Sequence, residues 1–289
     1  MEINNLFGGA SQTQPEGDAP ISYKVKNVSY VSYLNTKPLV YGLEKGLVKH
    51  DFVMQKDVPS VCAERLLQGE VELGLIPSIE YARGKGGLKI VPELCIASRG
   101  AVKSVALFFN QDIRRINTIA LDTSSRTSVA LLKILLLEKF EIEPQFVPMA
   151  PDLQEMLQKA DAALVIGDRA LQYQASFPNH LDLGEEWTDM TGLPFVYAFW
   201  AGHELSLSND EVTIMQKSYE IGAQNIEKIS REYAVGKTQS WQFYQEYLTR
   251  NIFYKLDEDE KAGLLEFYHY AFYLGLIEHI PELHFYEDQ

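Results

Sequence analysis

Short apolar segments that read as β-strands alternate with helix-like segments through most of this 289-residue chain. Such alternation is typical of α/β proteins, in which helices cover a largely parallel sheet. Beyond Asn209 the pattern changes to amphipathic helices only. The expected strands are 25–30, 52–55, 71–76, 88–97, 104–109, 118–121, 145–148, 162–166, 180–183 and 195–201, and the expected late helices are about 210–230, 240–250 and 258–275.

One α/β unit, residues 118–195, interrupts another, residues 24–110, that is followed by the late helices. Two lobes with chain crossings near 110–117 and 196–202 would leave a cleft between them, and small ligands favour such clefts. We assign residues 1–22 to a disordered leader, 23–112 with 200–289 to lobe 1, and 113–199 to lobe 2.

Composition limits the partners and the compartment. The formal net charge of −14 argues against nonspecific binding to nucleic acid or to an anionic membrane, so an anionic ligand would need local donors. No apolar stretch is long enough for a transmembrane helix, and the leader lacks the pattern of a signal peptide. Cys62 and Cys95 lie in apolar surroundings and are expected to be reduced core residues of a cytoplasmic protein.

The run Leu121–Ser128 (LDTSSRTS) places hydroxyls and a guanidinium where a strand meets a helix N-terminus. The first turn of a helix has unpaired N–H groups and the positive end of the helix dipole, so this junction favours a carboxylate or phosphate. An ordinary N-cap is the alternative, although capping needs only one such residue. The candidate anion-binding residues are Ser124, Ser125, Arg126, Thr127 and Ser128.

Four more polar residues lie beside strand ends. Asn35 follows the first strand, where it offers an amide donor or serves as a turn residue. Ser78 and Asp168 stand at strand-to-helix junctions, where capping is the alternative to a role in the site. Ser104 opens a strand after Arg99 and Lys103. All four are expected near the cleft.

The six histidines predict neither a metal site nor a general base. None lies in these loops, and no two have the helical spacing of metal ligands with a carboxylate nearby. We expect no metal and no cofactor.

Six segments, taken in order, resemble the chorismate dehydratases of the futalosine route to menaquinone. Each segment alone is weak, but the ordered combination is specific and runs from about residue 25 to 205. The segments are VSYLNTKPL (31–39), GLIPSIEY (74–81), SRGAVKSV (98–105), LDTSSRTS (121–128), LVIGDRAL (164–171) and DLGEEW (182–187).

The resemblance implies a two-lobed, periplasmic-binding-protein-like fold (type II) with a helical C-terminal tail. It implies a hydro-lyase that removes water from chorismate, a dianion, to give 3-[(1-carboxyvinyl)oxy]benzoate in menaquinone biosynthesis. Asn35, Ser78 and Asp168 would then be catalytic, while Ser104 and the five residues of the Ser-rich junction would bind substrate. No nucleic acid or membrane partner is expected, and a homodimer is compatible with the family.

The chemistry requires fixed donors around the ring carboxylate, because removal of the ring proton spreads charge onto that group. Since no protein base stands out in the sequence, we hypothesise that the enolpyruvyl carboxylate of the substrate takes the proton. Two alternatives stay open. One is a binding protein for an anionic solute, and the other is the sister 1,4-dihydroxy-6-naphthoate synthase, which would be expected to place a catalytic histidine near the cleft.

Overall fold

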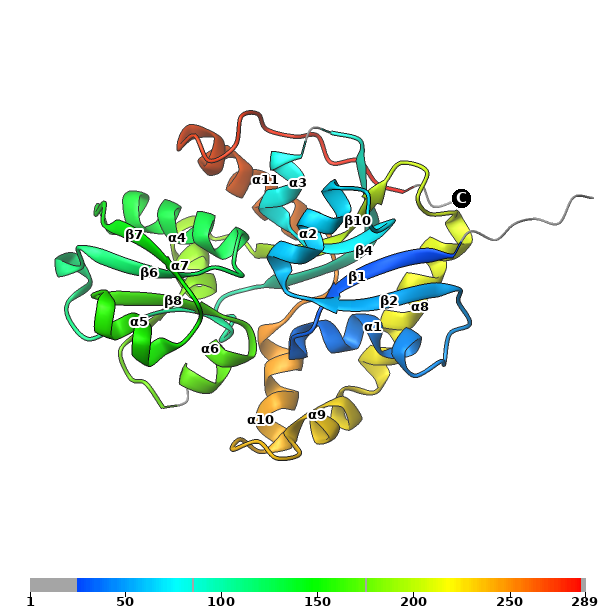
Figure 1. Cartoon of the computed structure of the whole chain (residues 1–289), viewed down its shortest axis with the longest axis horizontal. Helices are drawn as coiled ribbons and strands as arrows, with labels where there is room; N and C mark the ends of the chain where they lie inside the picture. The colour runs from blue at the N-terminus through cyan, green and yellow to red at the C-terminus, as the bar shows by residue number, and fades with distance from the viewer. Residues whose placement is uncertain (1–24, 85, 175, 287–289) are drawn as a thin grey trace, which may run out of the picture.

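The computed structural model describes residues 25–84, 86–174 and 176–286, so the expected leader lies outside the described residues. Two lobes lie side by side, each built on a five-stranded sheet with helices packed on it (Figure 1). The lobe that carries both described chain ends is lobe 1, and the other is lobe 2.

The sheet of lobe 1 has the strand order β2-β1-β3-β10-β4. β1 pairs in parallel with β2 and β3, whereas β10 runs antiparallel between β3 and β4. The strands are β1 (Lys26–Val31), β2 (Phe52–Asp57), β3 (Leu73–Pro77), β4 (Leu88–Ser98) and β10 (Phe195–His203).

The sheet of lobe 2 has the order β7-β6-β8-β5-β9, in which β5 runs antiparallel to both of its neighbours. The strands are β5 (Val105–Phe109), β6 (Thr118–Asp122), β7 (Gln145–Met149), β8 (Ala162–Ile166) and β9 (His180–Asp182).

The sheets divide the chain differently from the expected boundaries. β5, which we assigned to lobe 1, pairs in the sheet of lobe 2, and β10 returns to lobe 1 from Phe195 instead of residue 200. The crossings therefore lie at 99–104 and at 192–194, since the helix Leu183–Thr191 packs on lobe 2. An apolar strand reads the same whichever sheet it joins, because pairing is set by partners distant in sequence.

Helices cover both sheets, and the late part of the chain is helical as expected. One helix, α7, is absent from the expected elements, and the helix expected at 210–230 is divided at Asn225. The helices are α1 (Lys37–Glu44), α2 (Pro59–Leu67), α3 (Ser78–Arg83), α4 (Thr127–Glu138), α5 (Leu153–Lys159), α6 (Gly167–Gln174), α7 (Leu183–Thr191), α8 (Asn209–Gln224), α9 (Ile226–Ala234), α10 (Trp241–Glu246) and α11 (Glu258–Tyr273), with a π-helical turn at Tyr247–Asn251.

The helical tail is part of lobe 1. α8 lies against α1 at very short range, since a Cβ on Gly222 would be 1.9 Å from the carbonyl oxygen of Pro38. α11 packs on β10, where Phe267 contacts Phe195 edge to face with ring centroids 4.9 Å apart. Such aromatic packing in a fully buried core stabilises the lobe through both burial and ring geometry. As expected, Cys62 and Cys95 are buried and free.

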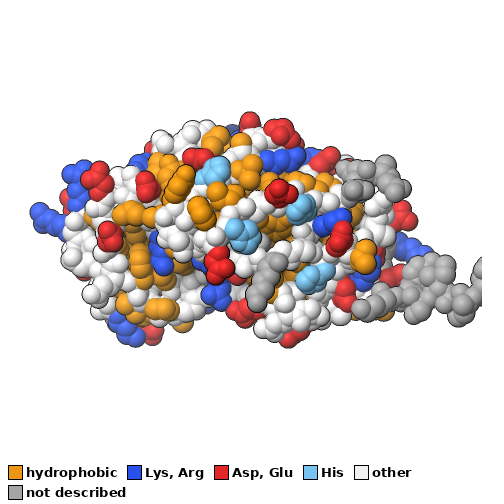
Figure 2. All heavy atoms as spheres, turned by 90° about the horizontal axis from the view of Figure 1, so that it is seen from above, with side chains coloured by type: hydrophobic (Ala, Val, Ile, Leu, Met, Phe, Trp, Pro, Cys, Tyr) orange, Lys and Arg blue, Asp and Glu red, His pale blue; other side chains and the backbone are white. Residues whose placement is uncertain are grey.

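Acidic and basic side chains are interspersed on the face shown in Figure 2, so the net negative charge is not gathered there into one region. Among the described residues, no helix combines the length and the apolar character needed to span a bilayer.

Candidate functional site

A cavity of about 550 Å³, counted with the part that opens to solvent, lies between the lobes. Its wall includes the loop after β1, the start of β5, the N-terminus of α4 and the end of β8. The lining residues are Val31, Tyr33, Asn35, Thr36, Pro59, Pro77, Ile96, Val102, Ser104, Val105, Ser125, Arg126, Thr127, Ser128, Ile166, Gly167, Tyr197 and Ala198. Apolar walls with a few polar groups are typical of small-molecule sites.

The N-terminus of α4 supplies most of the polar groups of lobe 2 in this wall. The Asp122 carboxylate shapes the turn before the helix, since it accepts bonds from the Ser124 N–H (2.9 Å) and the Ser124 hydroxyl (2.6 Å). The next residues, Ser125 to Ser128, then face the cavity. Among the described residues, the buried Ser125 hydroxyl has no hydrogen-bond partner, which leaves it available to a ligand.

Lobe 1 contributes the loop between β1 and α1, whose 3₁₀ turn covers Leu34–Thr36. The side-chain oxygens of Asn35 and Thr36 are buried and have no partner among the described residues. Buried polar atoms are nearly always paired, so unpaired ones on a cavity wall indicate a ligand site.

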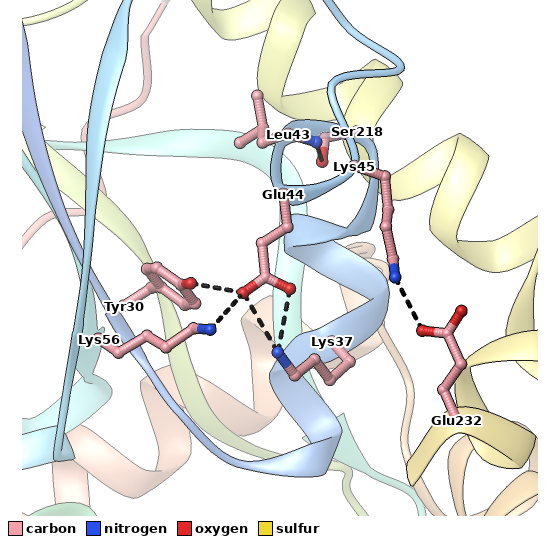
Figure 3. A network of polar contacts seen from close by, with 8 residues as sticks. All are labelled: Tyr30, Lys37, Leu43, Glu44, Lys45, Lys56, Ser218 and Glu232. Atoms are coloured by element: carbon pink, nitrogen blue, oxygen red, sulfur yellow. Dashed lines mark hydrogen bonds and ion pairs between the residues drawn. The ribbon is translucent and has the colours of Figure 1, made fainter.

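The two ends of this loop are anchored on one carboxylate, Glu44 (Figure 3). Glu44 accepts hydrogen bonds from the Tyr30 hydroxyl (2.6 Å) and the Lys37 ammonium (3.0 Å), and it pairs with Lys56 at 3.1 Å. Burial opposes ionisation of Glu44, but these donors outweigh it and lower its pKa. Tyr30 and Lys37 flank the loop, so the network fixes both of its ends in lobe 1.

The lobes touch around the cavity through several polar contacts. The Tyr33 and Ser124 hydroxyls are 3.5 Å apart, and the Leu34 N–H donates to Asp168 at 2.9 Å. On another side, the Ile79 N–H donates to the Thr127 hydroxyl at 3.2 Å, and Arg126 pairs with Glu64 at 2.8 Å. The structure is therefore a closed arrangement of the lobes.

Six of the nine site residues expected from the sequence line the cavity together. They are Asn35, Ser104, Ser125, Arg126, Thr127 and Ser128. The other three lie just behind the wall. Ser78 donates to the carbonyl of Val196 at 2.8 Å, Ser124 is bound to Asp122, and Asp168 reaches the loop of lobe 1. The roles of all nine stay predictions.

Two tyrosines on the wall and one behind it were not predicted as site residues from the sequence. Burial raises the pKa of Tyr33 to about 12, so its phenol stays protonated near neutral pH. Tyr197 lies on β10, where alternating aromatic residues mostly fill the core, and its hydroxyl is 3.3 Å from that of Ser98. The buried Tyr247, on the π-helical turn, interacts through its hydroxyl with Ser104 and Asn35. Such turns often occur at functional sites, but no sequence signal marks them.

Among the described residues, no histidine and no carboxylate lines the cavity, and Arg126 is the only basic side chain on its wall. The described part of the chain also contains no cluster of three or more His, Cys, Asp or Glu residues suited to a metal ion.

Residues 26–273 match a protein-family model described as menaquinone biosynthesis. A chorismate dehydratase of Thermus thermophilus is 31% identical over an alignment of 253 residues, and the match covers 81% of this chain and 91% of that protein. The chain belongs to the menaquinone biosynthesis family. A chorismate dehydratase of Campylobacter jejuni is 28% identical over an alignment of 243 residues, and the match covers 82% of this chain and 93% of that protein.

Solved structures confirm the fold expected for this family. A protein of Archaeoglobus fulgidus aligns with a TM-score of 0.72 at 19% identity, covering 87% of this chain and 98% of its own. A Candida albicans protein described as having the generic periplasmic-binding-protein fold aligns with a TM-score of 0.67 at 12% identity. The alignment covers 92% of this chain and 99% of that protein. The expected periplasmic-binding-protein-like, two-lobed architecture is therefore correct.

Proposed function

We propose that this protein is a chorismate dehydratase, a hydro-lyase that converts chorismate to 3-[(1-carboxyvinyl)oxy]benzoate in menaquinone biosynthesis. The observation that carries the proposal is the 31% identity, over 91% of its length, to a relative named chorismate dehydratase. The cavity supports it, because polar donors from both lobes converge on one space between the lobes, where small ligands bind in folds of this kind.

One substrate carboxylate would bind at the N-terminus of α4, which offers backbone N–H groups and the Ser125 hydroxyl, with the Arg126 side chain on the same wall. The other end of the substrate would meet Asn35 and Ser104. These donors are local, as a chain of net charge −14 requires for an anionic ligand. Donors fixed before the reaction stabilise the charge that develops on the ring carboxylate when the ring proton leaves.

The wall favours a proton acceptor that the substrate itself supplies. The titratable groups on the described wall are Tyr33, Tyr197 and Arg126, and burial raises the pKa of both phenols. We therefore retain the enolpyruvyl carboxylate as the base. The C–H bond breaks, its electron pair forms the dienolate, and the C–O bond to the ring hydroxyl then breaks as the ring becomes aromatic. The enolpyruvyl carboxyl group then passes this proton to the departing hydroxide, which leaves as one water molecule. Tyr33 stays protonated and can donate a hydrogen bond to the oxygen that departs.

The test is incubation of the purified protein with chorismate alone, followed by ultraviolet absorbance and mass analysis of the product. The proposal predicts an aromatic product lighter than chorismate by one water. Asn35→Ala and Ser125→Ala should slow the reaction, whereas Ser176→Ala on the surface of lobe 2 should not.

Two other outcomes would replace the proposal. Thermal stabilisation by chorismate without turnover would favour a binding protein, because a ligand that binds only the folded state raises its stability. Turnover of a cyclised futalosine product would favour the sister naphthoate synthase. Two observations disfavour that enzyme: the relatives are named as dehydratases, and no histidine among the described residues lines the wall. A cytoplasmic location and a homodimer stay proposals, which cell fractionation and sedimentation would test.

A further inference from the structure

The loop that carries Asn35 is held at its tip by the other lobe. The Tyr33 ring lies on Gly167, where an added Cβ would be 2.7 Å from two ring carbons. The next residue, Asp168, accepts a hydrogen bond from the Leu34 N–H at 2.9 Å. Gly167 has φ 66°, a conformation that favours glycine, so both the backbone and the space require a glycine here.

Asp168 is close to the cavity but is not part of its wall. It stands in the first turn of α6 and is half-buried, and burial raises its pKa. Its other neighbour is the Tyr233 hydroxyl of α9, in the helical tail of lobe 1. Asp168 therefore contacts lobe 1 at two places, the Leu34 N–H and Tyr233, and neither contact needs a substrate.

We propose that Gly167 and Asp168 position Asn35, so that the amide of Asn35 takes its working orientation only when the lobes are closed. The proposal rests on the proposed function, because it gives Asn35 a substrate to act on. It assigns Asp168 to positioning, in place of the catalytic role that the resemblance implies. The ends of the loop are already fixed in lobe 1 by the Glu44 network, so the tip is the part that lobe 2 controls.

Closure would then complete the site, as in enzymes that assemble their catalytic groups when they close around a substrate. An open protein would keep the Ser-rich end of the site and the contact of Asn35 with Tyr247 within lobe 1. It would lose the bond from lobe 2 that fixes the tip of the loop and, with it, the position of Asn35. Loss of the Asp168 contact should thus affect the chemical step more than binding, since a misplacement of about 1 Å can cost roughly 100-fold in rate.

The experiment compares Asp168→Ala, Asp168→Asn and Gly167→Ala with a matched control, Asp152→Ala. Asp152 caps α5 of the same lobe through a bond from the Glu155 N–H and touches no part of the loop. Steady-state kinetics with chorismate give kcat and KM, and hydrogen exchange reports the Leu34 amide with and without chorismate. Thermal denaturation checks that each variant is folded.

Asp168→Ala and Gly167→Ala should lower kcat by roughly 10- to 100-fold with a smaller change in KM, and should speed exchange of the Leu34 amide. Asp168→Asn keeps an acceptor for that amide and should retain most of kcat, while Asp152→Ala should change neither readout. The inference is wrong if Asp168→Asn is as inactive as Asp168→Ala, because that result assigns a proton or a charge to Asp168. It is equally wrong if Leu34 exchange is unchanged in Asp168→Ala in both states. Failure of the proposed function would look different: wild-type protein would not turn over, yet the exchange difference would persist.

Discussion

Neutralising the two partners of the Arg126–Glu64 ion pair should change catalysis in opposite directions. Arg126 lines the cavity from the N-cap of α4, and its guanidinium pairs at 2.8 Å with Glu64 of α2 in the facing lobe. The side chains are 39% and 53% exposed, so the pair lies where the cavity meets solvent. Glu64 thus competes with a substrate carboxylate for the basic side chain of the wall.

The exposure of the two side chains decides which general magnitude applies to each effect. A hydrogen bond to a charged group contributes about 1.5–3 kcal/mol, so Arg126→Gln should lower kcat/KM by roughly 10- to 150-fold. An exposed ion pair contributes only about 0.2–1 kcal/mol, because solvent screens it. Glu64→Gln frees Arg126 from this competition and should raise kcat/KM by roughly 1.4- to 5-fold.

The assay is steady-state dehydration of chorismate by both single variants and by the double variant. The double variant should behave like Arg126→Gln, because Glu64 has no effect once its partner is uncharged. Glu227→Gln is the matched control, since it removes one negative charge from a similarly exposed pair with Arg231. A Glu64→Gln variant slower than wild type would refute the reasoning and would show that the pair acts mainly by holding the lobes together.

Three further predictions concern stability and binding. Gly222→Ala would place a Cβ 1.9 Å from the Pro38 carbonyl oxygen and should lower the free energy of unfolding by about 1–3 kcal/mol, as measured by thermal denaturation. Gly236 has φ 72° and open space around it, so Gly236→Ala should lower that free energy by about 1–2 kcal/mol at most. Burial raises the pKa of Tyr33 to about 12 from an ordinary value of 10.0, so the folded state holds this proton more tightly. Its stabilising effect is complete below about pH 10 and is lost as pH rises toward about 12, and denaturant unfolding of wild type and Tyr33→Phe should reveal the difference. Ser125→Ala should leave the melting temperature almost unchanged, because the hydroxyl has no partner in the described protein, but should raise KM by roughly 2- to 12-fold.

Alternation of apolar segments sufficed to predict the α/β class and most elements, because strand and helix periods are local properties of a sequence. The alternation did not predict α7, which begins with Leu183 and Gly184. Asp182 caps this helix, because its carboxylate accepts hydrogen bonds from the N–H groups of Gly184 and Glu185. A glycine near the start of that segment weakens the helical pattern. The sheet to which β5 belongs was unpredictable, since no local signal encodes a distant partner.

The candidate site shows the same division between local and distant information. The Ser-rich junction was found because hydroxyls at a strand-to-helix turn are visible in sequence, and four of its five residues face the cavity. The direction of each hydroxyl was not visible: Ser124 turns back to Asp122, and Ser78 turns to the Val196 carbonyl. Tyr33 and Tyr197 were not predicted as site residues, because burial on a cavity wall and burial in a core select the same residue types.

The position of β10 constrains how the chain can fold during synthesis. This strand lies between β3 and β4, yet it follows the whole of lobe 2 in sequence. Until the ribosome has released residues 195–203, β3 and β4 each present an unpaired edge, which is a template for association with other chains. Lobe 2 is continuous in sequence and can fold first. Lobe 1 can complete its sheet only after β10 has been synthesised. A chaperone that shields β3 and β4 would therefore act between the folding of lobe 2 and the folding of lobe 1.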